Sequence, residues 1–210
     1  MGKITLNPVE RVYYAFYISK KREMYFNEIR AKTGMSISSL QNVISKLDKS
    51  GETIRRKEKA NTFYMLNDKR IIALHFTKFD MIKLDNLHRN IKIPVSEFLG
   101  KIGRVAFILL FGSASRGEEK KGSDIDVLVV TYKFEDGNLD GLYKKEIKRN
   151  FERAKKLADA KSLYPLSLAF VDEEEFTTRK DYLLEEGGKT GLCIYNNLNY
   201  YRMVFNYENL

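Results

Sequence analysis

The sequence predicts an α+β protein in three segments: residues 1–68, a helical linker at 69–98, and a C-terminal region at 99–210 that forms a mixed sheet. In the first segment, apolar residues recur at helical spacing, and a short alternating hairpin follows them. In the last segment, apolar runs of strand length alternate with helical patterns, which is typical of helices packed on a sheet.

Three helices are predicted in the first segment. Two of them cover Pro8–Lys20 and Phe26–Lys32. The third opens at Ser36 or Ser38, keeps its apolar residues at helical spacing, and ends at Gly51. This order of helices has the spacing of a helix-turn-helix.

The positive charge of the chain gathers in the same segment. Strands at 53–56 and 62–66 form a hairpin with a basic turn between them. Residues 1–67 carry 13 Lys and Arg against 6 Asp and Glu, whereas residues 68–210 carry 24 against 22, within a formal net charge of +9. A small domain with this excess is expected to attract a polyanion.

Three helices and a basic hairpin resemble the winged helix-turn-helix family of DNA-binding domains. The resemblance implies that the third helix enters the major groove of DNA and that the hairpin lines the backbone or the minor groove. A basic surface that contacts proteins is the alternative. The candidate DNA contacts are Ser38, Ser39, Gln41, Asn42, Ser45, Lys46, Lys49, Arg55, Arg56, Lys57 and Lys59.

The linker is predicted as a long helix over Lys69–Asn90 and a second helix over Pro94–Lys101 with the proline in its first turn. Apolar residues of the long helix occupy more than one face. Two arrangements fit this pattern: packing against both neighbouring domains, or contact with a second copy in a homodimer, which would suit a protein that reads paired half-sites.

The C-terminal region contains a polar segment between two predicted strands, Val105–Phe111 and Val127–Thr131. Gly112 permits a tight turn after the first strand, so that backbone N–H groups and the Ser113 hydroxyl can meet phosphate oxygens. The same turn allows a ligand to approach the backbone closely.

Two carboxylates, Asp124 and Asp126, open the second strand. They stand at i and i+2, so both point to one face while Ile125 turns into the core. Neighbouring carboxylates repel each other, and Mg²⁺ held jointly with substrate phosphates relieves that repulsion. The alternative is a polar hairpin loop with solvated acids. The conjunction of an apolar strand, Gly-Ser, a basic loop and Asp-x-Asp favours a site for a metal-bound nucleoside triphosphate.

This segment resembles the signature of the minimal nucleotidyltransferases of the DNA polymerase beta superfamily. By that resemblance, Asp124 and Asp126 are catalytic and ligate Mg²⁺, Ser113 beside Gly112 contacts the triphosphate, and Arg116 neutralises phosphate charge. A solvated loop is the alternative for Arg116. The matching residues are Phe111, Gly112, Ser113, Arg116, Gly117, Ser123, Asp124, Ile125 and Asp126.

Active members of that family usually carry a third carboxylate on a later strand. The later strand here, within Tyr164–Phe176, has Ser167 and Ala169 at the alternate positions, and Asp172 is expected to cap a helix. Two functions follow. The first is transfer of a nucleotidyl group, most simply AMP from ATP, to a hydroxyl of a protein or small molecule. The second is a DNA-binding transcription regulator that binds nucleotide without turnover.

The remaining elements complete the predicted sheet. A helix over Leu139–Ala160 is expected to turn Leu142 and Leu157 inward, together with Ile147, Phe151 and Ala154. Two strands are predicted at 166–171 and 191–196, with a helix near 174–186 between them.

Two further groups of residues can have either a structural role or a role in ligand binding. Lys120 and Lys121 are expected to be solvated loop residues. The aromatic residues of the tail can pack in the core, which we favour, or stack on a nucleobase; they are Tyr200, Tyr201, Phe205 and Tyr207.

Apolar runs and the cysteine content indicate the cellular compartment in which the protein is expected. No apolar run reaches the length of a membrane span, and the N-terminus lacks the apolar block of a signal peptide. The single cysteine, Cys193, cannot form an internal disulfide. We therefore expect a cytoplasmic protein with no membrane partner.

Overall fold

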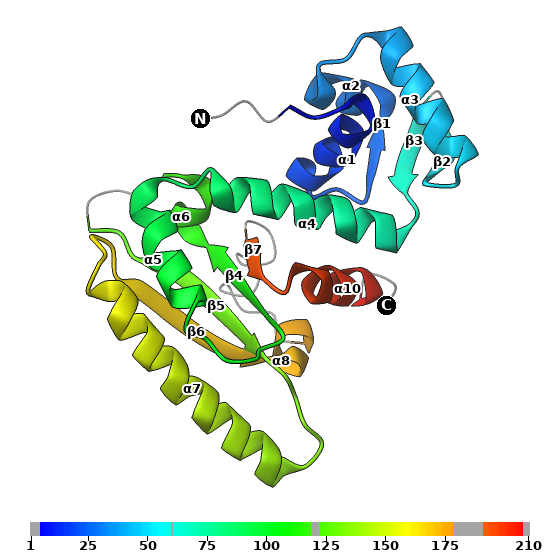
Figure 1. The fold of residues 1–210 in the computed structure, drawn as a ribbon. Helices are drawn as coiled ribbons and strands as arrows, with labels where there is room; N and C mark the ends of the chain where they lie inside the picture. Colours follow the sequence, from blue (N-terminus) through cyan, green and yellow to red (C-terminus); the bar gives the residue numbers. More distant parts are fainter. Residues whose placement is uncertain (1–4, 60, 119–121, 179–190, 208–210) are drawn as a thin grey trace. The chain divides into compact units, whose positions relative to one another are not determined.

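The computed structural model describes residues 5–59, 61–118, 122–178 and 191–207 (Figure 1). The chain divides into two compact units: Met1–Ile82 with Tyr201–Leu210, and Lys83–Tyr200. These boundaries cut the expected linker at 69–98 between Ile82 and Lys83. The protein is α+β, as expected, and its larger sheet is mixed.

The first unit begins with the three expected helices, α1 (Pro8–Ser19), α2 (Phe26–Thr33) and α3 (Ile37–Lys49). A capping box between Asn7 and Glu10 starts α1, because each side chain accepts a hydrogen bond from the other residue's backbone N–H. The N-cap of α3 is Ser36, whose hydroxyl accepts the backbone N–H of Ser39.

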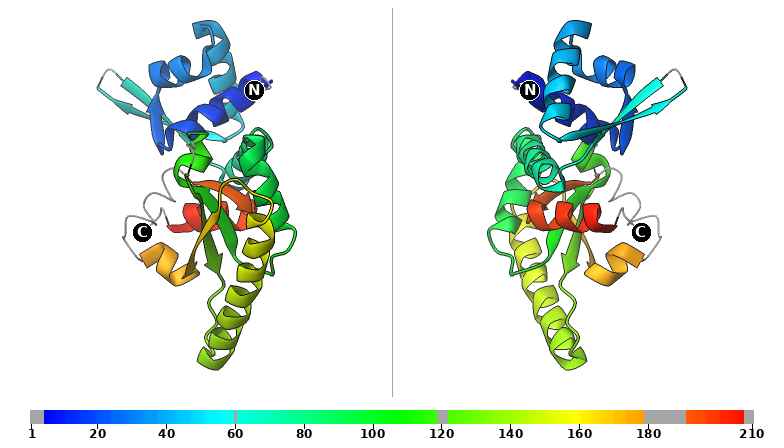
Figure 2. Two further views of the ribbon diagram at one scale, coloured as in Figure 1. Left: turned by 90° about the vertical axis from the view of Figure 1, so that its left-hand side faces the viewer. Right: turned by 90° about the vertical axis from the view of Figure 1, so that its right-hand side faces the viewer.

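A three-stranded antiparallel sheet accompanies the helices. Its strands are β1 (Glu23–Tyr25), β2 (Thr53–Glu58) and β3 (Asn61–Leu66), in the order β1-β3-β2. Figure 2 shows β2 and β3 as a hairpin that projects away from the helices of this unit. The hairpin was predicted, whereas β1 was not, because three residues are too few for an alternating pattern to be recognised.

The core of this unit is aromatic and contains one buried carboxylate. The rings of Tyr17 on α1 and Phe79 on α4 (Lys69–Asp85) lie 5.4 Å apart. Asp80 is fully buried and accepts hydrogen bonds from the Tyr17 hydroxyl at 2.6 Å and the Tyr201 hydroxyl at 2.7 Å. These bonds join α1, α4 and the C-terminal helix α10 (Asn197–Tyr207).

The helical linker differs from the predicted one. The helix expected over Lys69–Asn90 ends at Asp85, and α5 runs over Arg89–Leu99 with Pro94 in its interior instead of its first turn. The imidazole of His88 accepts the backbone N–H of Asn90, and α5 starts five residues earlier than expected. Tertiary packing explains the change, because burying the hydrophobic face of α5 outweighs the hydrogen bond that an interior proline removes.

The second unit contains a four-stranded mixed sheet. Its strands are β4 (Phe107–Phe111), β5 (Ile125–Thr131), β6 (Leu166–Asp172) and β7 (Leu192–Tyr195), in the order β6-β5-β4-β7. β5 is parallel to β6, and β4 is antiparallel to both β5 and β7.

Helices α5 and α7 (Gly137–Asp159) lie side by side along one face of this sheet (Figure 1). The buried face of α7 is a narrow stripe that includes Ile147, Phe151 and Ala154. Leu142, expected to point inward, is 69% exposed, and Leu157 is exposed as well. Both predictions are wrong because these leucines lie far around the helix from the stripe that meets the sheet.

Two short helices follow strand ends, α6 (Gly112–Arg116) after β4 and α8 (Glu173–Thr178) after β6. The helix expected near 174–186 therefore begins as predicted, and its continuation lies outside the described residues. None of the described helices combines the length and the apolar character that a membrane span requires.

Candidate functional site

The antiparallel pairing of β4 with β5 brings the two halves of the polar segment together. In this pairing Phe111, the last residue of β4, lies opposite Asp126, the second residue of β5. The chain turns at Gly112 directly after Phe111, so the turn begins beside the Asp126 carboxylate. Residues 14 positions apart in the sequence thus form one site.

Gly112 approaches Asp126 so closely that any side chain at this position would have to displace the Asp126 carboxylate. Its φ is +68°, and a Cβ atom built on it would lie 2.6 Å from Oδ2 of Asp126. The glycine is therefore required both for its backbone conformation and for the space it leaves to the carboxylate.

Strand alternation separates the acids from the core. Ile125 and Val127 are fully buried in the core beneath α5 and α7, so Asp126 faces the other side of the sheet. Asp124 is exposed just before the strand and has the same parity as Asp126. The two carboxylates lie close enough for the charge of Asp124 to act on Asp126, and their shared face remains the prediction from the spacing.

The charge state of Asp126 reflects its surroundings. Burial raises the pKa of Asp126 above its ordinary value of 3.8, and the negative charge of Asp124 raises it further. A hydrogen bond with Ser167 acts in the opposite direction. A divalent cation would relieve the repulsion between the two acids, so this donor set fits Mg²⁺ shared with phosphate oxygens.

The neighbouring strand offers Ser167 where a third acid would stand. In the parallel pairing of β5 with β6, Ser167 lies beside Asp126, and Ala169 follows two residues later beside Leu128. In the described part of the chain, no group of three or more His, Cys, Asp or Glu residues could hold a metal ion. The described donors are therefore the Asp124 and Asp126 carboxylates.

Asp172 has a structural role, as the sequence predicts. Its carboxylate accepts the backbone N–H of Glu175 at 2.8 Å, and its own N–H donates to the Glu175 carboxylate at 3.1 Å. Lys144 donates to the other carboxylate oxygen at 2.7 Å. Asp172 thus caps α8 instead of joining the acid pair.

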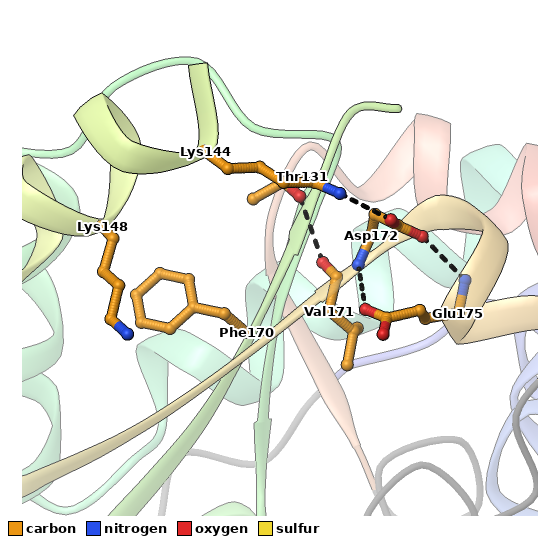
Figure 3. Close-up of a pocket in the computed structure, with 7 residues that line it drawn as sticks. All are labelled: Thr131, Lys144, Lys148, Phe170, Val171, Asp172 and Glu175. Carbon is orange, nitrogen blue, oxygen red and sulfur yellow. Dashed lines mark hydrogen bonds and ion pairs between the residues drawn. The ribbon is translucent and has the colours of Figure 1, made fainter. Parts of the chain in front are cut away.

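Figure 3 shows these contacts around a cavity of about 130 Å³ that Lys148 and Phe170 also line. Burial alone would raise the pKa of Asp172, but the hydrogen bonds from Lys144 and from the Glu175 backbone outweigh it and hold the pKa below its ordinary value. Asp172 pairs with Thr131 at the far end of β5, five residues from Asp126. At about 3.3 Å per residue, that separation is roughly 17 Å.

The turn after β4 positions two further predicted residues. Ser113 is half-buried, and its hydroxyl makes no hydrogen bond to the described residues. Arg116 ends α6 and donates from Nε to the Glu118 carboxylate at 2.8 Å. The sequence reasoning did not anticipate this ion pair, although the i+2 spacing on a turn was visible. Lys120 and Lys121 lie outside the described residues.

Two aromatic residues of the tail pack inside the protein. Tyr200 is buried against the rings of Phe107 and Phe176. Tyr201 is buried, binds Asp80 and stacks on Phe205. The favoured core interpretation is confirmed for both tyrosines, whereas the side chain of Tyr207 lies outside the described part of the chain.

The first unit carries a second group of predicted residues. Ser39 is half-buried, and the candidates on α3 that are exposed are Ser38, Gln41, Asn42, Ser45, Lys46 and Lys49. On the hairpin, Arg55, Lys57 and Lys59 are also exposed.

Arg56 differs from its basic neighbours. It donates to Glu23 at 2.9 Å and to Glu58 at 2.6 Å, and its guanidinium carbon lies 5.0 Å from the centre of the Phe63 ring. These contacts fasten β2 to β1 across β3. Arg56 is therefore held by other strands of the sheet, whereas Arg55 pairs with Asp48 of α3 at 3.6 Å.

A mixed sheet, a Gly-Ser turn against one aspartate and a second aspartate two residues away are the features that favour a domain of the nucleotide-transferring class. Comparison with known families agrees, because residues 94–189 match the nucleotidyltransferase domain. The second unit thus contains a region similar to nucleotidyltransferase domains. No curated protein matches the chain.

Proposed function

We propose that the nucleotidyltransferase domain moves a nucleotidyl group, AMP from ATP, to a hydroxyl of a protein or small-molecule acceptor, and that the first unit binds DNA as a winged helix-turn-helix. The observation that carries the first part is the close approach of Gly112 to Asp126, with Asp124 exposed two residues earlier in the chain. This geometry supports one anionic pocket beside the turn.

Each residue of the pocket has a role in this proposal. Asp124 and Asp126 would hold Mg²⁺, which neutralises charge on the triphosphate and on the leaving pyrophosphate. The Ser113 hydroxyl binds a phosphate oxygen. Arg116 exchanges its exposed ion pair with Glu118 for the phosphate charge, and such an exposed pair costs little to break, about 0–1 kcal/mol.

Transfer is tested with ATP labelled at the α-phosphate, Mg²⁺ and cell extract. The expected result is label on a protein or small molecule, lost in Asp126→Ala and retained in Asp172→Ala, which changes an acid outside the pocket. Label that persists in Asp126→Ala would rule out this pocket as its source.

The second candidate function is a regulator that binds nucleotide without turnover, favoured by the position of Ser167 beside Asp126. Calorimetry with Mg-ATP and an assay of pyrophosphate release separate the two. Binding without release supports the regulator. In that case Ser167→Asp, which puts a third carboxylate beside Asp126, is expected to produce release, whereas Ala169→Asp, beside Leu128, is not.

The DNA-binding proposal is supported by the three helices, the projecting hairpin and the basic excess of residues 1–67. A gel shift on duplex DNA is expected to weaken steeply as salt increases, because each phosphate contact releases a counterion. Absent or salt-insensitive binding would remove this part of the proposal.

We also propose that the protein forms a homodimer through α4. Leu74 and Met81 are exposed on α4, seven residues apart and therefore on one side of the helix. Sedimentation of the full chain tests this, with Leu74→Glu expected to give a monomer.

A further inference from the structure

One exposed residue on α3 stands out from its polar neighbours. Ile37 is the first residue of this helix and is 49% exposed. Gln41 and Ser45 follow it at intervals of four, so the three side chains form one row along the helix. The row of side chains on α3 that would face DNA thus begins with an apolar residue, Ile37.

Other residues fix the start of α3. Met35 and Leu40, at the positions that flank a helix start, are both buried and supply the apolar contact that fixes the entry of the chain. The helix start itself is satisfied by Ser36. Ile37 is therefore available to a partner.

We propose that Ile37 is a base-reading residue that contacts the C5-methyl group of a thymine in the major groove. This inference rests on the proposed DNA binding of the first unit. Residues at the N-terminal end of a recognition helix reach base edges, and apolar side chains recognise the thymine methyl. Gln41, one turn further along, has the amide that pairs with adenine. Ile37 and Gln41 together select a site that contains A·T pairs.

The experiment uses the full chain and duplexes that it selects from a random-sequence pool. Each thymine of a selected duplex is replaced in turn by uracil, which removes the methyl group and keeps the hydrogen-bonding edge. Replacement at one position is expected to weaken binding about fourfold, the equivalent of about 0.8 kcal/mol for one buried methyl group. Ile37→Ala is expected to bind thymine and uracil duplexes equally.

Ile54→Ala is the matched control. Ile54 is also an exposed isoleucine of the first unit, at 44%, but it lies on β2 and not on α3. This variant is expected to keep the preference for thymine. Circular dichroism melting of both variants checks that each is folded.

Two results separate this inference from the function on which it rests. Salt-dependent binding with no loss at any uracil position, or a thymine preference that survives Ile37→Ala, overturns the role of Ile37 and leaves DNA binding intact. Failure to select any duplex overturns the DNA-binding proposal and this inference with it.

Discussion

A Cβ atom on Gly112 would lie 2.6 Å from Oδ2 of Asp126, so the turn after β4 lies directly against the carboxylate on β5. The two residues come from opposite ends of the polar segment. Their contact depends on the register that pairs Phe111 with Asp126. The turn and the acid consequently act as one structural unit.

Gly112→Ala is expected to weaken Mg-ATP binding by about tenfold, or about 1.4 kcal/mol, because the added methyl group displaces the Asp126 carboxylate. Alanine at positive φ also costs about 1–2 kcal/mol of stability. Calorimetry measures the binding, and thermal unfolding measures the stability.

Gly117→Ala is its matched control. Gly117 has φ +69°, nearly that of Gly112, but no atom lies within 4 Å of a Cβ built there. The two variants are expected to lose similar stability, while only Gly112→Ala loses affinity. Equal losses of affinity would contradict the role assigned to the Gly112–Asp126 contact.

Asp126→Asn is expected to stabilise the metal-free protein at pH 7 by less than about 1 kcal/mol, since the group is partly solvated. The raised pKa of Asp126 means that its contribution to stability is full below its ordinary value of 3.8 and is lost as pH rises through the raised folded-state value. The gain from Asn should therefore shrink between pH 7 and about pH 4. Thermal melts in a chelator across this range measure it.

Asp124→Asn is a second test of the repulsion between the Asp124 and Asp126 carboxylates. It removes the neighbouring charge that raises the pKa of Asp126, so a smaller stabilisation in the same direction is expected. A destabilisation by both variants at pH 7 would show that the two carboxylates do not oppose each other.

Lys144→Met is expected to destabilise the protein by about 1–3 kcal/mol, because it leaves the Asp172 carboxylate without its closest cation. The Asp172 side chain is only 5% exposed. Its lowered pKa gives stability that is present above its ordinary value of 3.8 and lost as pH falls through the lower folded-state value. The cost of the substitution should therefore be largest near neutral pH and smaller in acid, as urea unfolding can measure.

Lys148→Met serves as the comparison. Lys148 lines the same cavity and makes no ion pair with the described residues, so its loss is expected to leave stability nearly unchanged. If both variants cost the same, the pairing of Lys144 with Asp172 would not be the cause.

Lys49→Ala is expected to reduce the salt dependence of DNA binding by a slope of about 1, the loss of one phosphate contact. Arg56→Ala is expected to leave the slope unchanged and to lower stability instead, because Arg56 holds Glu23 and Glu58. Fluorescence anisotropy at several salt concentrations and thermal melts measure the two effects. If only Arg56→Ala changed the salt dependence of binding, Arg56 and not Lys49 would make the phosphate contact.

Much of the fold could be predicted because its signals are local. The capping box at Asn7 and Glu10, the helix start at Ser36 and the apolar runs of β4 and β5 each depend on residues within a few positions of one another. Local signals failed where burial was decided elsewhere. Leu142 fits a helical pattern, yet the sheet meets another side of α7.

The candidate site divides in the same way. The outward position of Asp126 between the buried Ile125 and Val127 could be predicted, because alternation along a strand needs no knowledge of the neighbouring strands. The proximity of Gly112 to Asp126 and of Ser167 to Asp126 could not, because strand register sets both. The ion pair of Arg56 with Glu23 could not be predicted either, because Glu23 lies on a strand that had no recognisable sequence pattern.

The sequence by itself determined the types of most elements, the outward position of Asp126 on its strand and the concentration of positive charge near the N-terminus. The tertiary structure decided which distant residues meet: a glycine against a carboxylate, a serine where a third acid would stand, and a lysine on Asp172. The physical reason is that backbone sterics and side-chain periodicity act over a few residues, whereas register and burial depend on packing between segments far apart in the chain.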